Sequence, residues 1–138
     1  MGLDMGSKTI GVALSDELGI VANGMGTISR QGTDRDLKTL ADLVSKYEVR
    51  QIVVGLPIRM AGTVGIEAKK VLQFVEKMKR SLSVPITTWD ERLTTVQAQR
   101  VLLEAGLSRK KRKKVIDKTA ATLILQSYLD AEQTRASS

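Results

Sequence analysis

Three acidic residues stand where they could hold metal ions for a hydrolytic reaction. Asp4 ends a short apolar segment and is followed by Gly6, Glu91 follows the apolar segment 84–89, and Asp117 lies in a helical pattern near the end of the chain. Carboxylates from two strand ends and a helix can hold two Mg²⁺ or Mn²⁺ ions roughly 4 Å apart, which activate water for phosphodiester cleavage. The spacing therefore predicts Asp4, Glu91 and Asp117 as catalytic, metal-binding residues.

Each of these acids also has an ordinary structural interpretation. Asp4 and Gly6 could form a hairpin turn with a solvated carboxylate. Asp90 and Glu91 are adjacent, so an extended backbone points them to opposite sides, and only one can be the main ligand. We favour Glu91 for its longer reach, and Asp90 remains the alternative.

Asp117 shares one helical face with apolar residues, which favours an inward-facing carboxylate. The residues that follow it at helical spacing are Ala120, Ala121, Ile124 and Tyr128. Two alanines would let the helix approach the sheet and bring Asp117 near Asp4. The alternative is a buried structural aspartate satisfied by a backbone N–H or by Lys8.

The composition narrows the possible chemistry. The 138 residues include no cysteine and no histidine, which excludes disulfides, thiolate metal sites and histidine general bases. Any metal must therefore have oxygen ligands, which favours Mg²⁺ or Mn²⁺. No apolar run approaches the roughly 20 residues of a membrane span, and no signal peptide opens the chain, so we expect a cytoplasmic protein.

The positive charge is concentrated in one place. The net charge is +7, and the run Arg109–Lys114 contributes six positive charges, which leaves 7 − 6 = +1 for the rest of the chain. Such a run is often only a solvated face, but beside a cluster of acids it suits a polyanion. Candidate phosphate-binding side chains are Lys8, Arg59, Arg92, Arg109, Lys110 and Lys113, although Arg92 could equally pair with a surface acid.

The hydrophobic pattern predicts an α/β domain over residues 1–138. Expected strands cover the first residues, 9–15, 20–28, 51–57 and 84–89, and the first three would form an antiparallel meander. Expected helices cover 34–48, 65–81, a segment from Thr94 to Gly106, and 109 to about 131, with a loose tail from about 132. Strands that alternate with helices in the second half imply parallel crossovers.

Four segments together resemble the YqgF/RuvX family of pre-16S rRNA nucleases and Holliday junction resolvases. They are residues 2–13 (GLDMGSKTIGVA), 52–57 (IVVGLP), 90–95 (DERLTT) and 117–121 (DKTAA), in the family's order. The resemblance implies an RNase H-like fold, a mixed five-stranded sheet with helices on both faces, and a two-metal nuclease. It also implies maturation of the 5′ end of 16S rRNA, with cleavage of branched DNA as the alternative substrate.

Two departures from the family pattern affect these expectations. The first strand is shorter than usual, and the loop after Gly-Leu-Pro reads Arg59-Met60-Ala61-Gly62 in place of Asn-Met-Asp-Gly, which puts any metal or substrate role of that loop in doubt. A non-catalytic RNA-binding assembly factor is the alternative of another class. A sugar-kinase or actin-like ATPase would need a second domain that 138 residues do not allow. We expect a monomer or a weak dimer with no membrane partner.

Overall fold

Five strands form one mixed sheet in the order β3-β2-β1-β4-β5. The computed structural model describes residues 1–94 and 109–136, and the side chains of residues 109–119 lie outside that description. The strands are β1 (Gly2–Met5), β2 (Thr9–Ser15), β3 (Ala22–Ser29), β4 (Ile52–Leu56) and β5 (Ile86–Asp90). The first three form the predicted antiparallel meander, and β4 is parallel to both β1 and β5.

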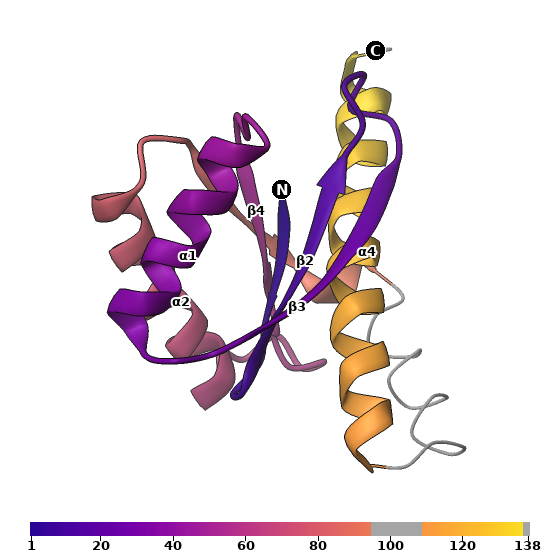
Figure 1. Ribbon diagram of the computed structural model, residues 1–138. Helices are drawn as coiled ribbons and strands as arrows, with labels where there is room; N and C mark the ends of the chain where they lie inside the picture. The colour runs from indigo at the N-terminus through magenta and orange to yellow at the C-terminus, as the bar shows by residue number, and fades with distance from the viewer. Residues whose placement is uncertain (95–108, 137–138) are drawn as a thin grey trace.

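Helices cover both faces of this sheet, as predicted. Helices α1 (Thr33–Lys46) and α2 (Ile66–Ser81) lie on one face, and the long helix α4 (Arg109–Ala136) lies on the other (Figure 1). A short 3₁₀ turn, η1 (Glu91–Leu93), follows β5. Among the described residues, no helix combines the length and the apolar character needed to cross a membrane.

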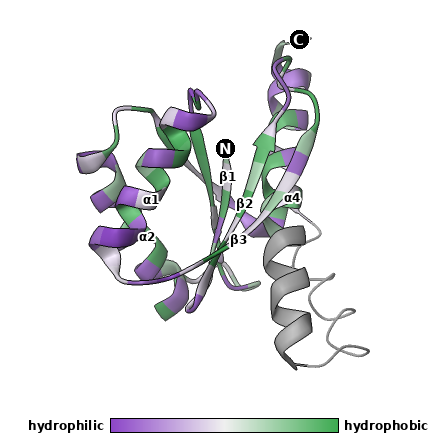
Figure 2. Ribbon diagram, viewed as in Figure 1, coloured by the Kyte–Doolittle hydropathy of each residue, from purple (hydrophilic) through white to green (hydrophobic). Residues whose placement is uncertain are grey.

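The sheet separates two hydrophobic cores, because successive strand residues point to opposite faces. Leu3, Val12 and Val54 face α1 and α2, where they pack with side chains such as Leu40 and Phe74. The other face of the same strands packs against α4, and its buried residues are Ala13, Ala22, Val53, Ala120, Ala121, Ile124 and Leu125. Figure 2 shows apolar residues on the inner sides of the helices and along the strands.

Several boundaries differ from those expected. β3 begins at Ala22 and not at Ile20, because the Asp16 carboxylate accepts the backbone N–H groups of Ile20 and Val21 at 2.7 and 3.2 Å. Helix α4 continues to Ala136, so the segment expected to be a loose tail from about 132 is helical as far as that residue. The helix expected between Thr94 and Gly106 falls outside the described residues.

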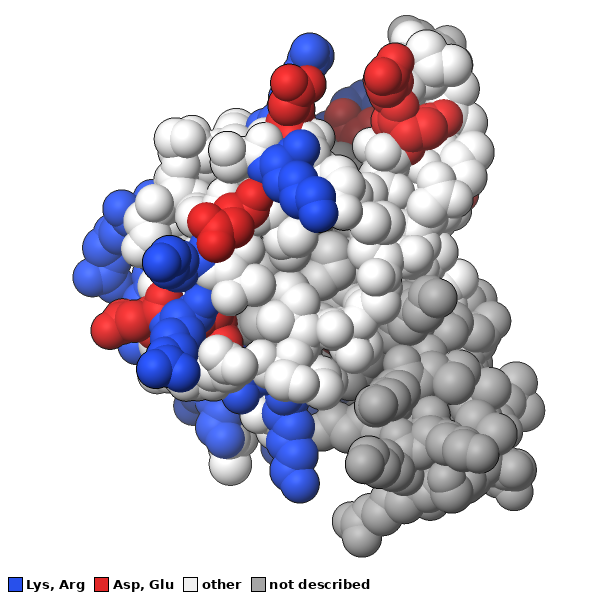
Figure 3. All heavy atoms as spheres, viewed as in Figure 1, with Lys and Arg blue, Asp and Glu red and all other residues white. Residues whose placement is uncertain are grey.

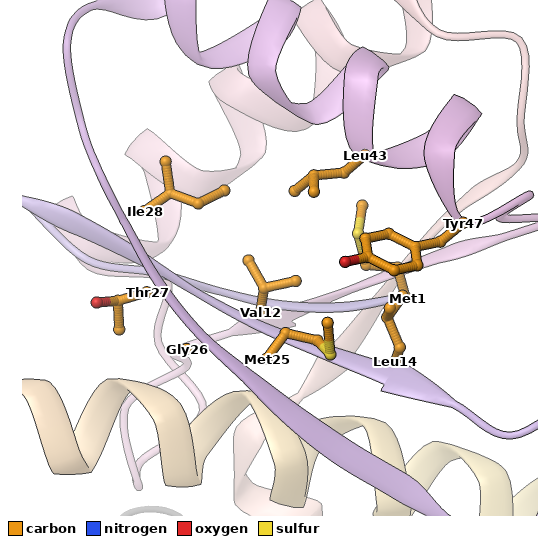
Figure 4. A pocket seen from close by; sticks show the side chains of 9 residues that line it. All are labelled: Met1, Val12, Leu14, Met25, Gly26, Thr27, Ile28, Leu43 and Tyr47. Atoms are coloured by element: carbon orange, nitrogen blue, oxygen red, sulfur yellow. The ribbon is translucent and has the colours of Figure 1, made fainter.

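An apolar pocket of about 120 Å³ lies on the face of the sheet that α1 covers (Figure 4). Its lining comes from β2, β3 and α1 together with Met1, and includes Val12, Met25 and Tyr47. The lining carries no acidic or basic side chain, so this pocket does not offer the chemistry that the sequence predicts.

Candidate functional site

Asp4 lies on β1, the central strand of the sheet, on the face that α4 covers. It pairs with Gly11 across β1 and β2, while Leu3 points into the opposite core. Its exposed fraction is 4%. The expected hairpin between β1 and β2 is present, but the expectation of a solvated Asp4 carboxylate is wrong because this residue is buried.

Glu91 is also buried, with an exposed fraction of 1%. It begins η1 directly after β5, and its Cγ lies 3.3 Å from the position that a Cβ on Gly55 would take. β1 and β4 pair in parallel with Leu3 opposite Val54, so the next step in the register puts Asp4 beside Gly55. Gly55 thus lies next to both acids, and its missing side chain lets them converge.

The donors at this place suit a hard divalent cation. Asp4 Oδ2 and Glu91 Oε1 are buried oxygens that accept no hydrogen bond within the described residues, although each residue makes another interaction. Burying carboxylates costs free energy unless other charges compensate them. No group of three potential ligands is found among the described residues. The two acids fit a metal ion, and the third predicted ligand would have to come from beyond the described side chains.

Asp117 is the predicted third ligand, and its side chain lies outside the described residues. Its backbone position can still be compared with that of Asp4. Helix α4 runs antiparallel to β1, and the carbonyl of Ala121 lies 3.1 Å from the Cβ position of Gly2. Four helical residues span about 6 Å and two strand residues about 6.6 Å. Position 117 of the helix is therefore about level with Asp4 along the strand.

The structure distinguishes Asp90 from its neighbour Glu91. Asp90 pairs with Arg92, whose Nη2 lies 2.7 Å from Asp90 Oδ2 and whose Nε lies 3.0 Å from the same oxygen. The side-chain hydrogen bond from Arg92 lowers the pKa of the Asp90 carboxyl below its ordinary value and raises that of the Arg92 guanidinium. Of the two readings of Arg92 in the sequence, the ion pair with a nearby acid is the one that the structure contains.

Two of the predicted phosphate-binding side chains flank the loop between β4 and α2. Arg59 is exposed and packs its guanidinium against Gly65, while Nη1 of Arg92 lies 3.4 Å from the Cβ position of Gly62. Lys8 is exposed in the turn between β1 and β2. β1 and β4 are parallel neighbours, so this turn and that loop leave the same edge of the sheet. The residues Arg59-Met60-Ala61-Gly62, which depart from the family pattern, therefore contribute a cation to this loop.

The basic run 109–114 forms the first turns of α4, and its side chains, including Arg109, Lys110 and Lys113, lie outside the described residues. Figure 3 shows Lys and Arg intermixed with Asp and Glu on the described part of the surface in that view. The two charge signs lie close together on the upper part of this view, and the lower edge of the described surface shows Lys and Arg without Asp or Glu.

Sequence reasoning missed the role of Gly55. A Cβ at this position would overlap Cδ1 of Ile124 and press on Glu91 Cγ, so only glycine lets α4 and Glu91 come this close to β4. The available signal was a glycine inside an otherwise apolar strand, which commonly marks a close approach of neighbouring groups.

The chain is similar to known proteins over nearly its whole length. A relative from Clostridium acetobutylicum is 58% identical over 131 residues, covering 95% of this chain and 97% of the relative. Another, from Thermoanaerobacter pseudethanolicus, is 54% identical over 136 residues and covers 98% of both chains. Both are named as proposed pre-16S rRNA nucleases.

Solved structures show the same fold at very low sequence identity. Thermus thermophilus RuvC in complex with a Holliday junction matches with a TM-score of 0.58 and 10% identity, over 96% of this chain and 94% of that one. Fowlpox virus resolvase with Holliday junction DNA matches with a TM-score of 0.51 and 10% identity, over 95% and 96%. The fold is thus RNase H-like. A family model described as "RuvX: Holliday junction resolvase" matches residues 1–131, and the chain belongs to this family.

Proposed function

We propose that this chain is a metal-dependent endonuclease that cleaves structured RNA, with the 5′ end of pre-16S rRNA as its substrate. Its family makes it a nuclease, a hydrolase of phosphodiester bonds. The observation that carries the metal-dependent part is the burial of Asp4 and Glu91 on either side of Gly55. Two buried carboxylates in a chain without histidine or cysteine suit Mg²⁺ or Mn²⁺.

In this proposal Asp4, Glu91 and Asp117 hold the metal ions. When bound, a pair of such ions activates the attacking water and stabilises the leaving oxygen. Asp4 is fixed by strand pairing with β2, and Glu91 is held by η1 immediately after β5. Because both carboxylates start from regular elements, their oxygens need little reorganisation before they bind a cation.

The substrate is bound mainly through its phosphates. Lys8, Arg59 and Arg92 lie on the described surface, and the run Arg109–Lys114 adds six positive charges at the start of α4. The chain has only 3% aromatic residues, so base stacking contributes little. RNA is favoured over DNA because the relatives are named for pre-16S rRNA. We place the reaction in the cytoplasm, with the protein as a monomer or weak dimer.

The experiment compares two substrates at matched length and salt concentration. One is an RNA that spans the 5′ end of 16S rRNA with its precursor extension, and the other is a four-way DNA junction. We expect cleavage of the RNA with Mg²⁺ or Mn²⁺, and none with EDTA or in the variant Asp4→Asn.

Other outcomes would contradict parts of this proposal. Cleavage of the DNA junction alone would make the chain a resolvase. Retention of the RNA in a gel without any cleavage, at every metal concentration, would make it a non-catalytic assembly factor. Cleavage that persists in EDTA would exclude the metal-dependent reaction.

A further inference from the structure

Arg30, which follows β3, contacts the turn between β1 and β2 and both α1 and α2. Its backbone N–H donates to the carbonyl of Lys8 at 2.9 Å, and its Nη1 donates to the carbonyl of Gly6 at 3.1 Å. Its Nε lies 3.2 Å from Oδ2 of Asp36 in α1. The guanidinium also lies over the ring of Phe74 in α2, 5.2 Å from the centroid. A single side chain therefore joins the turn between β1 and β2 to both helices on that face.

The partner of Arg30 in α1 is itself fixed. Asp36 is 2% exposed, and its Oδ1 accepts the backbone N–H of Gln31 at 2.9 Å. A buried carboxylate bound to a guanidinium and to a backbone amide has little freedom to move. Asp36 thus gives Arg30 a rigid anchor, and the planar fork of Arg30 extends from it to Gly6.

The turn that Arg30 holds is the one that follows Asp4. Gly6 N–H donates to Thr9 O at 2.8 Å and closes a tight turn only two residues after Asp4. On the side of α2 this turn faces a cleft of about 230 Å³, lined by residues that include Gly6, Ser7, Lys70 and Phe74. Packing against α2 is therefore incomplete there, and the Arg30 guanidinium crosses the gap.

We propose that Arg30 is a positioning residue for the nuclease reaction, which holds the Gly6–Lys8 turn and thereby fixes Asp4 for metal binding. Its contacts with Gly6, Asp36 and Phe74 hold the guanidinium on the face of the sheet that α1 and α2 cover, whereas Asp4 points to the face that α4 covers. Its effect on the reaction must therefore pass through the backbone. This inference rests on the assignment of Asp4 to the reaction centre in the proposed function.

The test uses the full chain and three variants. Arg30→Gln combined with Asp36→Asn removes the guanidinium without leaving a buried carboxylate unpaired. Arg30→Lys keeps the charge beside Asp36, but a single ammonium cannot reproduce the fork that also reaches Gly6. Arg80→Gln is the matched control, since it loses the same charge from a side chain whose one hydrogen bond within the described part of the chain is to Glu76 O of its own helix, at 3.4 Å.

The readouts are turnover at saturating RNA, KM for RNA, the Mg²⁺ concentration for half-maximal rate, and hydrogen exchange at residues 6–9. In the double variant we expect this Mg²⁺ concentration to rise or turnover to fall by roughly 10-fold, as for other residues that orient metal ligands. In the double variant KM should stay near that of the parent, and hydrogen exchange at residues 6–9 should accelerate. The values for Arg30→Lys should lie between those of the parent and those of the double variant. Arg80→Gln should behave as the parent.

Different results would overturn different claims. If both Arg30 variants kept the parent's turnover and Mg²⁺ dependence, Arg30 would not position Asp4. If only KM rose, Arg30 would be a substrate contact and the proposal would be wrong. The variant Asp4→Asn is measured in parallel: full activity there would remove the assignment of Asp4 itself, independently of how the Arg30 variants behave.

Discussion

At the scale of single residues, the environment of each acid separates its role from that of its neighbours. Asp4 and Glu91 are buried beside Gly55, whereas Asp90 forms an ion pair with Arg92. Buried carboxylates that lie near one another are stabilised by a bound cation. These surroundings favour the proposed metal-binding role of Asp4 and Glu91, and they give Asp90 a structural ion pair.

The first prediction concerns the charges of the buried acids. Asp4→Asn and Glu91→Gln should each lower turnover roughly 100-fold or more, the loss expected when one group that stabilises the transition state is removed. The melting temperature without metal should stay equal or rise slightly, because a buried charge is replaced by a neutral amide of similar shape. Turnover and thermal unfolding of the same samples check both parts.

The matched control is Asp90→Asn, which changes the adjacent acid. It should keep most of the turnover and lose only the ion pair with Arg92. If Asp90→Asn inactivated the enzyme while Glu91→Gln did not, the roles of the two acids would be reversed.

The second prediction is a pH dependence. The side-chain hydrogen bond from Arg92 lowers the pKa of Asp90 below its ordinary value of 3.8. The contribution of Asp90 to stability is therefore full above about pH 3.8, and is lost as the pH falls through the lower folded-state value. Arg92→Gln should return the pKa of Asp90 toward 3.8 and make unfolding less sensitive to acid. Urea titrations between pH 2 and pH 5 measure this, and an identical acid sensitivity in parent and variant would contradict it.

The charged candidate residues of the site could be predicted from the sequence, whereas the residues that determine the packing around them could not. The positions of Asp4 and Glu91 at strand ends follow from alternating apolar segments and the turns after them. The proposed role of Gly55 depends on its contact with Ile124, which is distant in the sequence. The proposed role of Arg30 depends on its ion pair with Asp36, which the packing of α1 places beside it. No local pattern encodes such contacts, so the sequence alone could not identify them.

At the scale of elements, the distance between α4 and the sheet is set by small residues. Gly2 faces Leu125 and the carbonyl of Ala121, and Gly55 faces Ile124. Trp89 Nε1 donates to Ser127 Oγ at 3.0 Å and ties β5 to the same helix. Because α4 also carries position 117, the close approach of helix and sheet decides whether a third carboxylate can reach Asp4 and Glu91.

The third prediction tests this approach. Gly55→Ala should destabilise the fold by roughly 1–3 kcal/mol, because its methyl group overlaps Ile124 Cδ1 and presses on Glu91. Ile124→Val removes that carbon and alone should cost about 0.5–1.5 kcal/mol. The double variant should be more stable than the sum of the two effects implies, as measured in a double-mutant cycle by urea unfolding.

Activity separates packing from catalysis in the same variants. Gly55→Ala should lower turnover even after Ile124→Val restores part of the stability, because the new methyl group still presses on Glu91. Strictly additive unfolding free energies would show that Gly55 and Ile124 do not interact in this way.

The helices and strands themselves were largely predictable, and their ends were not. Apolar periodicity located the five strands, the two helices on one face, and the last helix. The start of β3 depends on the Asp16 carboxylate, which accepts the N–H groups of Ile20 and Val21. α1 ends at Lys46 because Glu48 adopts a φ of 52°, which turns the chain toward β4. Local hydrogen bonds and backbone angles of this kind, and not the hydrophobic pattern, determine where the helices and strands begin and end.

The fourth prediction concerns the first turns of α4. If the basic run 109–114 binds the phosphate backbone, the double variant Lys110→Ala/Lys113→Ala should bind two unrelated RNA sequences more weakly, by about the same factor for each. Each lost phosphate contact should also reduce the slope of log K against log salt by roughly 0.7 to 0.9. Stability should barely change, since consecutive like charges repel one another and contribute little to a fold.

The measurement is a binding titration of parent and double variant at several salt concentrations. An unchanged slope on both RNAs would show that the run is only a solvated face. Lys8, Arg59 and Arg92 would then be the next candidates for phosphate binding.

At the scale of the whole molecule, the sheet order brings the parallel ends of β1, β4 and β5 together. Ligands of α/β sheets commonly bind beyond the carboxyl ends of parallel strands, and here those ends supply Asp4 and Glu91. The antiparallel β2 and β3 extend the sheet beyond β1, away from β4 and β5. α1 and α2 cover the face of the sheet opposite α4. The architecture thus leaves the α4 face for the candidate metal site at Asp4 and Glu91.

A crystal structure of the protein soaked in Mn²⁺, with anomalous diffraction to locate the metal, tests this metal site most directly. We expect anomalous density between the carboxylates of Asp4 and Glu91, close to position 117 of α4, with metal–oxygen distances of about 2.0–2.3 Å. The density should be absent from crystals of Asp4→Asn. Mn²⁺ bound elsewhere, or no Mn²⁺ between these acids in a protein that cleaves RNA under the same conditions, would contradict the assignment.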